Sequence, residues 1–187
     1  MKLSRSRGLI LTFIASSLIL VTLTPCFAGG KEDFKEAKEL WNMTKLSDAS
    51  ELFNKAILSG KLNMEELVEA HYNRAIFFFF YKPDQVMSEI NIVINYKPDY
   101  SAAYALRADA WVILSEDNKA LADWEKALKI NPDESVVYNN RSIFFENKGE
   151  LEKAINDLDK YLKLESQDSA RKKDIERLKA LYRTPKK

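Results

Sequence analysis

Apolar residues recur every three or four positions through most of this chain, from residue 31 to about residue 182. This spacing places them on one face of an α-helix, whereas the alternation of period two that is expected of strands is missing. Glycine and proline are scarce, and within this range they fall between the periodic segments. The pattern therefore predicts an all-α fold in which helices are joined by short turns.

Two parts of the helical region repeat each other at a spacing of 34 residues. The aligned positions are Tyr104 and Tyr138, Ala108 and Ser142, Trp111 and Phe145, Ala120 and Ala154, and Trp124 and Leu158. Small residues let two helices approach closely, and aromatic residues fill the space between them. The period therefore predicts stacked helical hairpins.

The same pattern extends in both directions and predicts four helix pairs followed by a final helix. The pairs cover residues 31–59, 65–98, 101–134 and 135–168, and residues 168–182 form a polar-backed capping helix. Asn63, followed three residues later by Glu66, is typical of a helix start. Gly149 stands in the turn of the fourth pair, where a left-handed backbone is expected.

These residues resemble the tetratricopeptide repeat family, whose pattern runs aromatic, small, aromatic, then alanine, aromatic, alanine and proline. The resemblance covers residues 31 to about 182 and is strongest in the third and fourth pairs. It implies a right-handed superhelical array of about four antiparallel helix pairs, an α-solenoid, plus a C-terminal capping helix. It also implies a concave groove, lined by the first helix of each pair, that binds peptides or protein segments.

In the family, the groove residues lie just after the small residue and about one turn to either side of it. Carried over to this sequence, the candidate protein-binding residues are Tyr72, Ile76, Phe79, Phe80, Asp109, Val112, Ile113, Asn139 and Ile143. The implied groove is apolar and aromatic toward its N-terminal end and more polar toward the other. A hydrophobic groove favours an amphipathic helix or an apolar peptide segment as its ligand.

Five consecutive aromatic residues, at positions 77–81, allow two interpretations. On a helix they cover all faces, so Phe78 can belong to the core while Phe79 and Phe80 point toward the groove. The alternative is that all five are buried, because the array curls or a terminal helix folds over them. The sequence leaves both interpretations open.

The first 28 residues have the layout of a secretory signal peptide. Three basic residues at the start precede an uncharged apolar run, and Cys26-Phe27-Ala28 places small residues where a signal peptidase cuts. We therefore expect cleavage after Ala28 and export to the periplasm. The alternatives are an uncleaved membrane anchor and a lipoprotein acylated on Cys26, for which the neighbouring Pro25 and Phe27 are poor fits.

Charge and missing residue types argue against several classes of function. Without residues 1–28 the chain keeps 26 of its 29 Lys and Arg residues against 28 Asp and Glu, and this near-neutral balance argues against nucleic acid as a ligand. The only cysteine leaves with the signal segment, and the only histidine, His71, aligns with helix-packing positions, so the common zinc sites cannot form. The sequence has no glycine-rich phosphate loop and no nucleophile elbow. We predict no cofactor and no enzymatic activity.

The predicted function is a protein–protein interaction scaffold or adaptor in the cell envelope, which holds a protein or peptide partner in its concave groove. Two alternatives differ in class: a homo-oligomeric structural component, and an accessory subunit of an envelope enzyme complex. Contact with a membrane is expected only through an uncleaved signal segment or a lipid anchor.

Overall fold

The computed structural model describes residues 29–79 and 82–183, so the predicted signal segment and Phe80 lie outside the described residues. Within these ranges the chain is helical and forms no strand, which confirms the predicted all-α fold. The helices there are α1 (Gly30–Asn42), α2 (Leu46–Leu58), α3 (Met64–Phe78), α4 (Pro83–Tyr96), α5 (Ser101–Ile113), α6 (Asp117–Ile130), α7 (Ser135–Asn147), α8 (Leu151–Leu164) and α9 (Ser169–Arg183). None of these helices is long and apolar enough to span a membrane.

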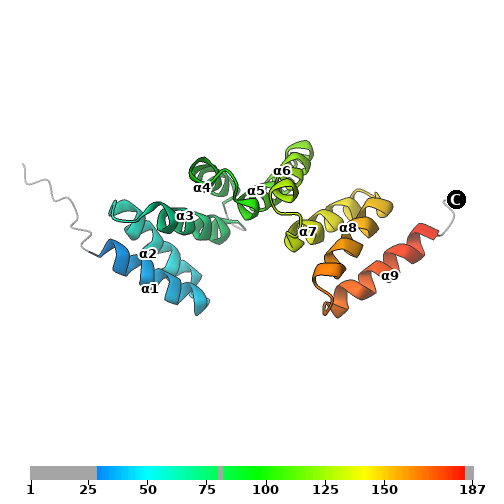
Figure 1. The fold of residues 1–187 in the computed structure, drawn as a ribbon, viewed down its shortest axis with the longest axis horizontal. Coiled ribbons are helices and arrows are strands. Elements are labelled where there is room, and N and C mark those ends of the chain that lie inside the picture. Colours follow the sequence, from blue (N-terminus) through cyan, green and yellow to red (C-terminus); the bar gives the residue numbers. More distant parts are fainter. Residues whose placement is uncertain (1–28, 80–81, 184–187) are drawn as a thin grey trace, which may run out of the picture.

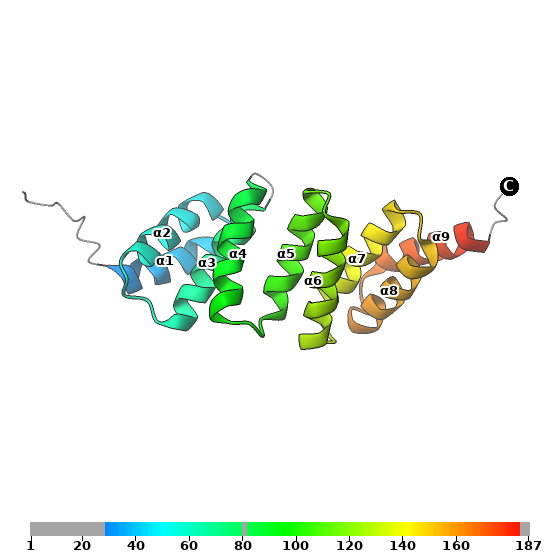
Figure 2. The same ribbon diagram turned by 90° about the horizontal axis from the view of Figure 1, so that it is seen from above.

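The helices pack in pairs that stack into an elongated arch (Figure 1). α1 packs on α2, α3 on α4, α5 on α6 and α7 on α8, while α9 packs on α8 at the end of the array. α4 and α6 lie on the outer, convex side of the arch, and α3, α5 and α7 lie below them, toward its inner side. Figure 2 shows the pairs following one another along the long axis, which is the arrangement of an α-solenoid.

Three groups of buried side chains share the core, one after another along the array. The N-terminal core cluster, around Phe53, joins α1 and α2 to α3. The central core cluster, around Ile90, joins α3, α4 and α5, and the C-terminal core cluster, around Trp124 and Leu158, joins α5 to α9. This division is the expected result of a fold in which each helix pair contacts mainly its neighbours.

The ends of several helices follow from the local sequence. Asn63 and Glu66 form a reciprocal capping box at the start of α3, because each side chain accepts a hydrogen bond from the other residue's amide, at 2.9 and 2.8 Å. Gly149 has a φ of 74° in the α7–α8 turn, as its position predicts. Ser115, 34 residues earlier, has a φ of 59°, so the α5–α6 turn uses the left-handed region without a glycine.

Two buried aspartates are held by arginines in the same way in successive pairs. Arg107 of α5 donates to both carboxylate oxygens of Asp123 in α6, at 2.7 and 2.8 Å. Arg141 of α7 donates to both oxygens of Asp157 in α8, at 2.7 and 2.9 Å. Each arginine precedes its aspartate by 16 residues. The bidentate ion pairs bind the two helices of a pair together and compensate the carboxylates for lost hydration.

Candidate protein-binding groove

A pocket of about 690 Å³ opens between α5 and α7, two helices of the inner side of the arch, and we call it the α5–α7 pocket. It is lined by Phe79, Asp109, Val112, Ile113, Ser115, Asp117, Trp124, Asn140, Ile143, Phe144, Asn147 and Lys148. These residues come from the end of α3, the second half of α5, α6, α7 and the turns beside these helices. The stacking of three successive pairs therefore builds the pocket.

Apolar side chains contribute an exposed part of the pocket wall. Ile113, at the last position of α5, is 49% exposed, and Ile143, in the middle of α7, is 37% exposed. Val112 and Phe79 are half-buried beside them. Because exposed large apolar residues gathered in a concavity are a common mark of a binding site, this wall is suited to contact with another apolar surface.

Asp109 is a mostly buried acidic residue in the wall of the α5–α7 pocket. Its Oδ1 accepts a hydrogen bond from the Trp124 indole at 3.0 Å, and its Oδ2 accepts one from the Asn140 amide at 2.7 Å. Burial raises the pKa of the Asp109 carboxyl to about 6, although the two hydrogen bonds act in the opposite direction. The carboxylate therefore links α5 to α6 and α7 while it faces a cavity.

The α5–α7 pocket brings together five of the nine predicted groove residues, namely Phe79, Asp109, Val112, Ile113 and Ile143. Tyr72 lies in a separate pocket of about 630 Å³ beside Tyr100, with 5.1 Å between the ring centroids. Ile76 is half-buried and lines neither of these two pockets. Phe80 lies outside the described residues. A role in partner binding stays a prediction for all nine.

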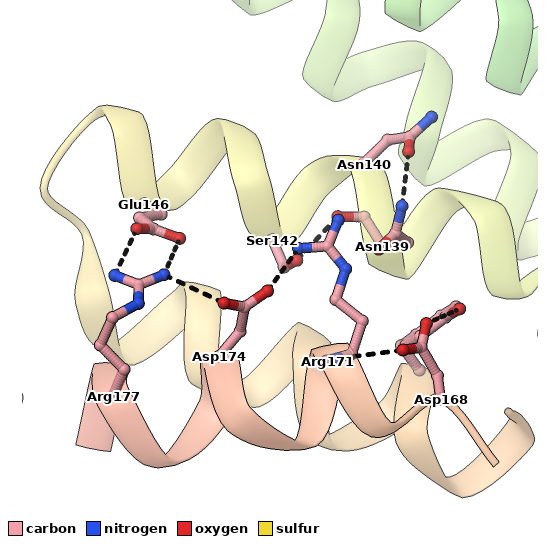
Figure 3. Close-up of polar contacts among 9 residues, drawn as sticks. Asn139, Asn140, Ser142, Glu146, Asp168, Arg171, Asp174 and Arg177 are labelled. Atoms are coloured by element: carbon pink, nitrogen blue, oxygen red, sulfur yellow. Dashed lines mark hydrogen bonds and ion pairs between the residues drawn. The ribbon is translucent and has the colours of Figure 1, made fainter. Parts of the chain in front are cut away.

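Asn139, the remaining predicted residue, belongs to a polar surface that continues from α7 to α9 (Figure 3). Its Nδ2 donates to Asn140 Oδ1 at 3.0 Å, next to the α5–α7 pocket. Farther along α7, Glu146 accepts two hydrogen bonds from Arg177 of α9, at 2.8 and 3.2 Å. The inner side of the array thus carries polar contacts toward its C-terminal end, while a gradient of polarity along the groove stays a prediction.

The single histidine does not line the α5–α7 pocket. His71 Nδ1 lies 2.6 Å from Glu89 Oε2, and both residues are buried between α3 and α4. Arg74 also contacts this carboxylate, with 3.0 Å between Nη2 and Oε1. His71 thus occupies the helix-packing position that its alignment predicts. In the described parts of the chain, no group of His, Cys, Asp and Glu side chains could hold a metal ion.

Sequence reasoning missed two residues that position Asp109. The repeat pattern assigns Trp124 to the core on its size, and the structure shows that its indole also donates to Asp109. A buried indole N–H needs an acceptor, and this requirement is the signal that could have linked the two residues. Asn140 carries no comparable signal, because its contact with Asp109 joins residues 31 positions apart in different repeats.

Comparison with known families and structures adds an independent observation. Residues 124–156 match the model of the tetratricopeptide repeat family. The segment begins within α6, includes all of α7 and ends within α8. This part of the chain is therefore similar to a tetratricopeptide repeat. No curated protein matches the sequence.

Solved structures with tetratricopeptide repeats share the fold of this chain. The thermophilic protein TTC0263 of Thermus thermophilus has a TM-score of 0.66 at 18% identity, over 82% of this chain and 83% of that one. The first such domain of Spaghetti (RPAP3), bound to an HSP90 peptide, has a TM-score of 0.58 at 18% identity, over 63% of this chain and 96% of that one. YrrB, which has an unusual peptide-binding site, has a TM-score of 0.62 at 14% identity, over 77% and 73% of the two chains.

These similarities confirm the predicted α-solenoid as a tetratricopeptide-repeat fold. The fold is generally a non-enzymatic scaffold for protein–protein interaction, and two of the compared structures belong to peptide-binding proteins.

Proposed function

We propose that this protein is a non-enzymatic scaffold that holds a peptide or protein segment in the α5–α7 pocket. The observation that carries the proposal is that Ile113 and Ile143, two exposed apolar residues from different repeats, line one pocket on the inner side of the array. Fully burying an isoleucine contributes about 1.5–3 kcal/mol, and because Ile113 is 49% and Ile143 37% exposed, covering the remaining surface contributes roughly 1 kcal/mol for each. An apolar segment that contacts both therefore gains part of its affinity there.

The contacts around the pocket favour a receptor that is formed before its ligand arrives. Asp109 joins α5 to α7 through Asn140, and it joins α5 to α6 through Trp124. Asp117, the first residue of α6, and Lys148, which follows α7, form an ion pair at the pocket wall. A preformed pocket loses little conformational entropy on binding, so more of the contact energy contributes to affinity.

We place this scaffold in the cell envelope, and the support for that location is the layout of residues 1–28. A basic start, an uncharged apolar run and a small-residue cleavage motif together favour export. Mass spectrometry of the N-terminus, after fractionation of cells that produce the full chain, tests this part of the proposal. An N-terminus at Gly29 in the periplasmic fraction supports it, and an intact Met1 in the cytosolic fraction contradicts it.

The test of partner binding compares two surface variants with the wild type. Ile143→Asp places a charge in the α5–α7 pocket, whereas Leu164→Asp places one at the end of α8, at a side chain that is 39% exposed and does not line the pocket. Photo-crosslinking in envelope extract, followed by identification of the captured protein and titration with it, measures the effect. We expect Ile143→Asp to weaken binding about tenfold or more and Leu164→Asp to leave it unchanged.

The same pair of variants also shows how the proposal could fail. The two side chains are exposed to a similar extent, 37% and 39%, so both variants should lose a similar, partial amount of stability, and circular dichroism shows that both are folded. If a folded Ile143→Asp variant binds the captured partner as tightly as the wild type, the α5–α7 pocket is not the binding site.

A further inference from the structure

We infer that the α5–α7 pocket selects a basic residue, so that the bound segment carries an arginine or lysine that pairs with Asp109 and is flanked by apolar residues. This inference rests on the proposed function, because it names the chemistry of the segment that the pocket would hold. The other buried carboxylates of this chain, each of which lies beside a cation, provide the comparison.

Three carboxylates in the described ranges are almost fully buried, and each has a cation of the same chain beside it. Glu89 is 7% exposed and contacts Arg74 and His71, Asp123 is 8% exposed and pairs with Arg107, and Asp157 is 4% exposed and pairs with Arg141. A buried carboxylate loses its hydration, and a paired cation is the usual compensation. The fold therefore supplies an internal cation wherever it buries a carboxylate this deeply.

Asp109 is less deeply buried than these three carboxylates, but it is still mostly buried and has no internal cation beside it within the described ranges. Its two hydrogen bonds come from uncharged donors, the Trp124 indole and the Asn140 amide. Across residues 29–79 and 82–183, no lysine, arginine or histidine forms an ion pair with it. Unlike Asp123 and Asp157, Asp109 lines an open pocket through which a cation of another molecule can reach it.

The charges around the pocket reinforce this difference. Lys148 is the one basic residue among the described residues that line the pocket, and its ammonium group pairs with Asp117, so the two charges offset each other. Asp109 is thus the one carboxylate among the described lining residues that has no cationic partner, so the uncompensated charge of the pocket is negative, which attracts a basic segment and repels an acidic one.

The apolar wall fits the stem of the same residue. Lysine and arginine bury a chain of three or four methylene groups along apolar surface while the charged end reaches a polar partner. Ile113 and Ile143 provide that surface in the pocket that also contains Asp109. A neutral aliphatic residue could use the isoleucines alone, and an acidic residue would face the Asp109 carboxylate. Pairing with Asp109 therefore favours a basic residue over a neutral aliphatic residue and over an acidic one.

Peptides with matched central residues test the inference. The probes are N-acetylated, C-amidated decapeptide pools with random Ala, Leu, Ser and Phe flanks and a central Arg, Lys, norleucine or Glu. Norleucine has nearly the length of lysine without its charge. Fluorescence anisotropy gives the dissociation constants for the wild-type protein. We expect the Arg and Lys pools to bind about tenfold more tightly than the norleucine pool, and the Glu pool to bind most weakly.

Two variants, each with one aspartate replaced by asparagine, show which carboxylate is responsible for the preference for a basic residue. Asp109→Asn removes the charge, and Asp117→Asn removes the other carboxylate of the pocket, which Lys148 already pairs. We expect Asp109→Asn to bring the Arg and norleucine pools within about twofold of each other while norleucine binding is kept. Asp117→Asn leaves Lys148 unpaired, so we expect it to reduce the preference for Arg without abolishing it. Far-ultraviolet circular dichroism confirms that both variants are folded.

The outcomes separate this inference from the proposed function. If the norleucine pool binds the wild type as tightly as the Arg pool, the pocket holds a segment but does not select a basic residue. The same conclusion follows if the preference survives in a folded Asp109→Asn variant. If no pool binds the wild type, the proposed function and this inference are both overturned. The comparison of pools on the wild type does not depend on the folding of any variant.

Discussion

Asp109 makes the stability of this protein depend on pH in a direction opposite to that of most carboxylates. Its pKa rises from 3.8 to about 6 on folding, so between these values the folded state holds its proton more tightly than the unfolded state. Stability from this group is present below about pH 4 and is lost as the pH rises through 6, by at most about 3 kcal/mol.

Asp109→Asn should remove this dependence. Urea denaturation at pH 4, 5, 6 and 7 measures the unfolding free energy of the variant and the wild type. Because the neutral amide carries no such penalty, we expect the variant to gain relative to the wild type as the pH rises, with most of the gain between pH 4 and 6. A difference that stays constant across this range would contradict the shifted pKa.

At the scale of single residues, the sequence predicts some of the pocket and omits the rest for a physical reason. Asp109, Val112 and Ile113 are implied by the resemblance to the tetratricopeptide repeat family, and they lie together because residues three or four apart share one face of α5. Asn140 depends on how α7 packs against α5, and no periodicity within one helix contains that information. Tyr72 is also implied by the family pattern, but the structure places it in a different pocket from these residues.

At the scale of one helix, α9 is attached by apolar contact more than by its ion pairs. Ile175 and Leu178 are buried in the C-terminal core cluster, whereas the Arg177 side chain, paired with Glu146, is 47% exposed. We expect Leu178→Ala to lower the unfolding free energy by about 2–5 kcal/mol and Arg177→Ala to lower it by less than about 1 kcal/mol. Urea denaturation of both variants measures this. Equal losses would mean that the polar contacts of Figure 3 hold the helix.

Helix boundaries could be predicted where a side chain or a glycine determines the backbone. Asn63 and Glu66 predict the start of α3 because their side chains accept hydrogen bonds from amides that have no carbonyl partner within the helix. Gly149 predicts the α7–α8 turn because glycine adopts a positive φ at little cost. Ser115 adopts the same conformation, but its residue type does not predict it, because the surrounding helices impose a backbone that serine does not prefer.

At the scale of the whole molecule, the period of 34 residues predicts the stacked pairs but not the division of their core. Ala103 and Ala110 of α5 belong to the central core cluster, while Tyr104 and Ala108 of the same helix belong to the C-terminal one. A repeat pattern describes each pair as equivalent to the next, so it does not reveal how side chains from one pair are shared between neighbours. That sharing determines how far a local disturbance spreads.

The N-terminal core cluster is the smallest part of the core, and we expect α1 and α2 to open without the rest of the array. Its members come from α1, α2 and a single position of α3, whereas the C-terminal core cluster draws on α5 to α9. In a solenoid, each pair is stabilised only by its neighbours, so the end with one neighbour and few buried side chains opens at the lowest free energy.

Hydrogen exchange followed by mass spectrometry, with the variants Phe53→Ala and Leu158→Ala, tests this expectation. Both side chains are fully buried, and each truncation removes about 2–5 kcal/mol of local packing. Phe53→Ala should accelerate exchange in α1 and α2 and leave α5 to α8 protected, because no buried contact of Phe53 reaches those helices. Leu158→Ala lies in the cluster that joins α5 to α9, and it should accelerate exchange throughout those five helices. Uniform acceleration of every helix by Phe53→Ala would instead show that the array unfolds as one cooperative unit. In that case the α5–α7 pocket would depend on the N-terminal pair for its stability, although no residue of that pair lines it.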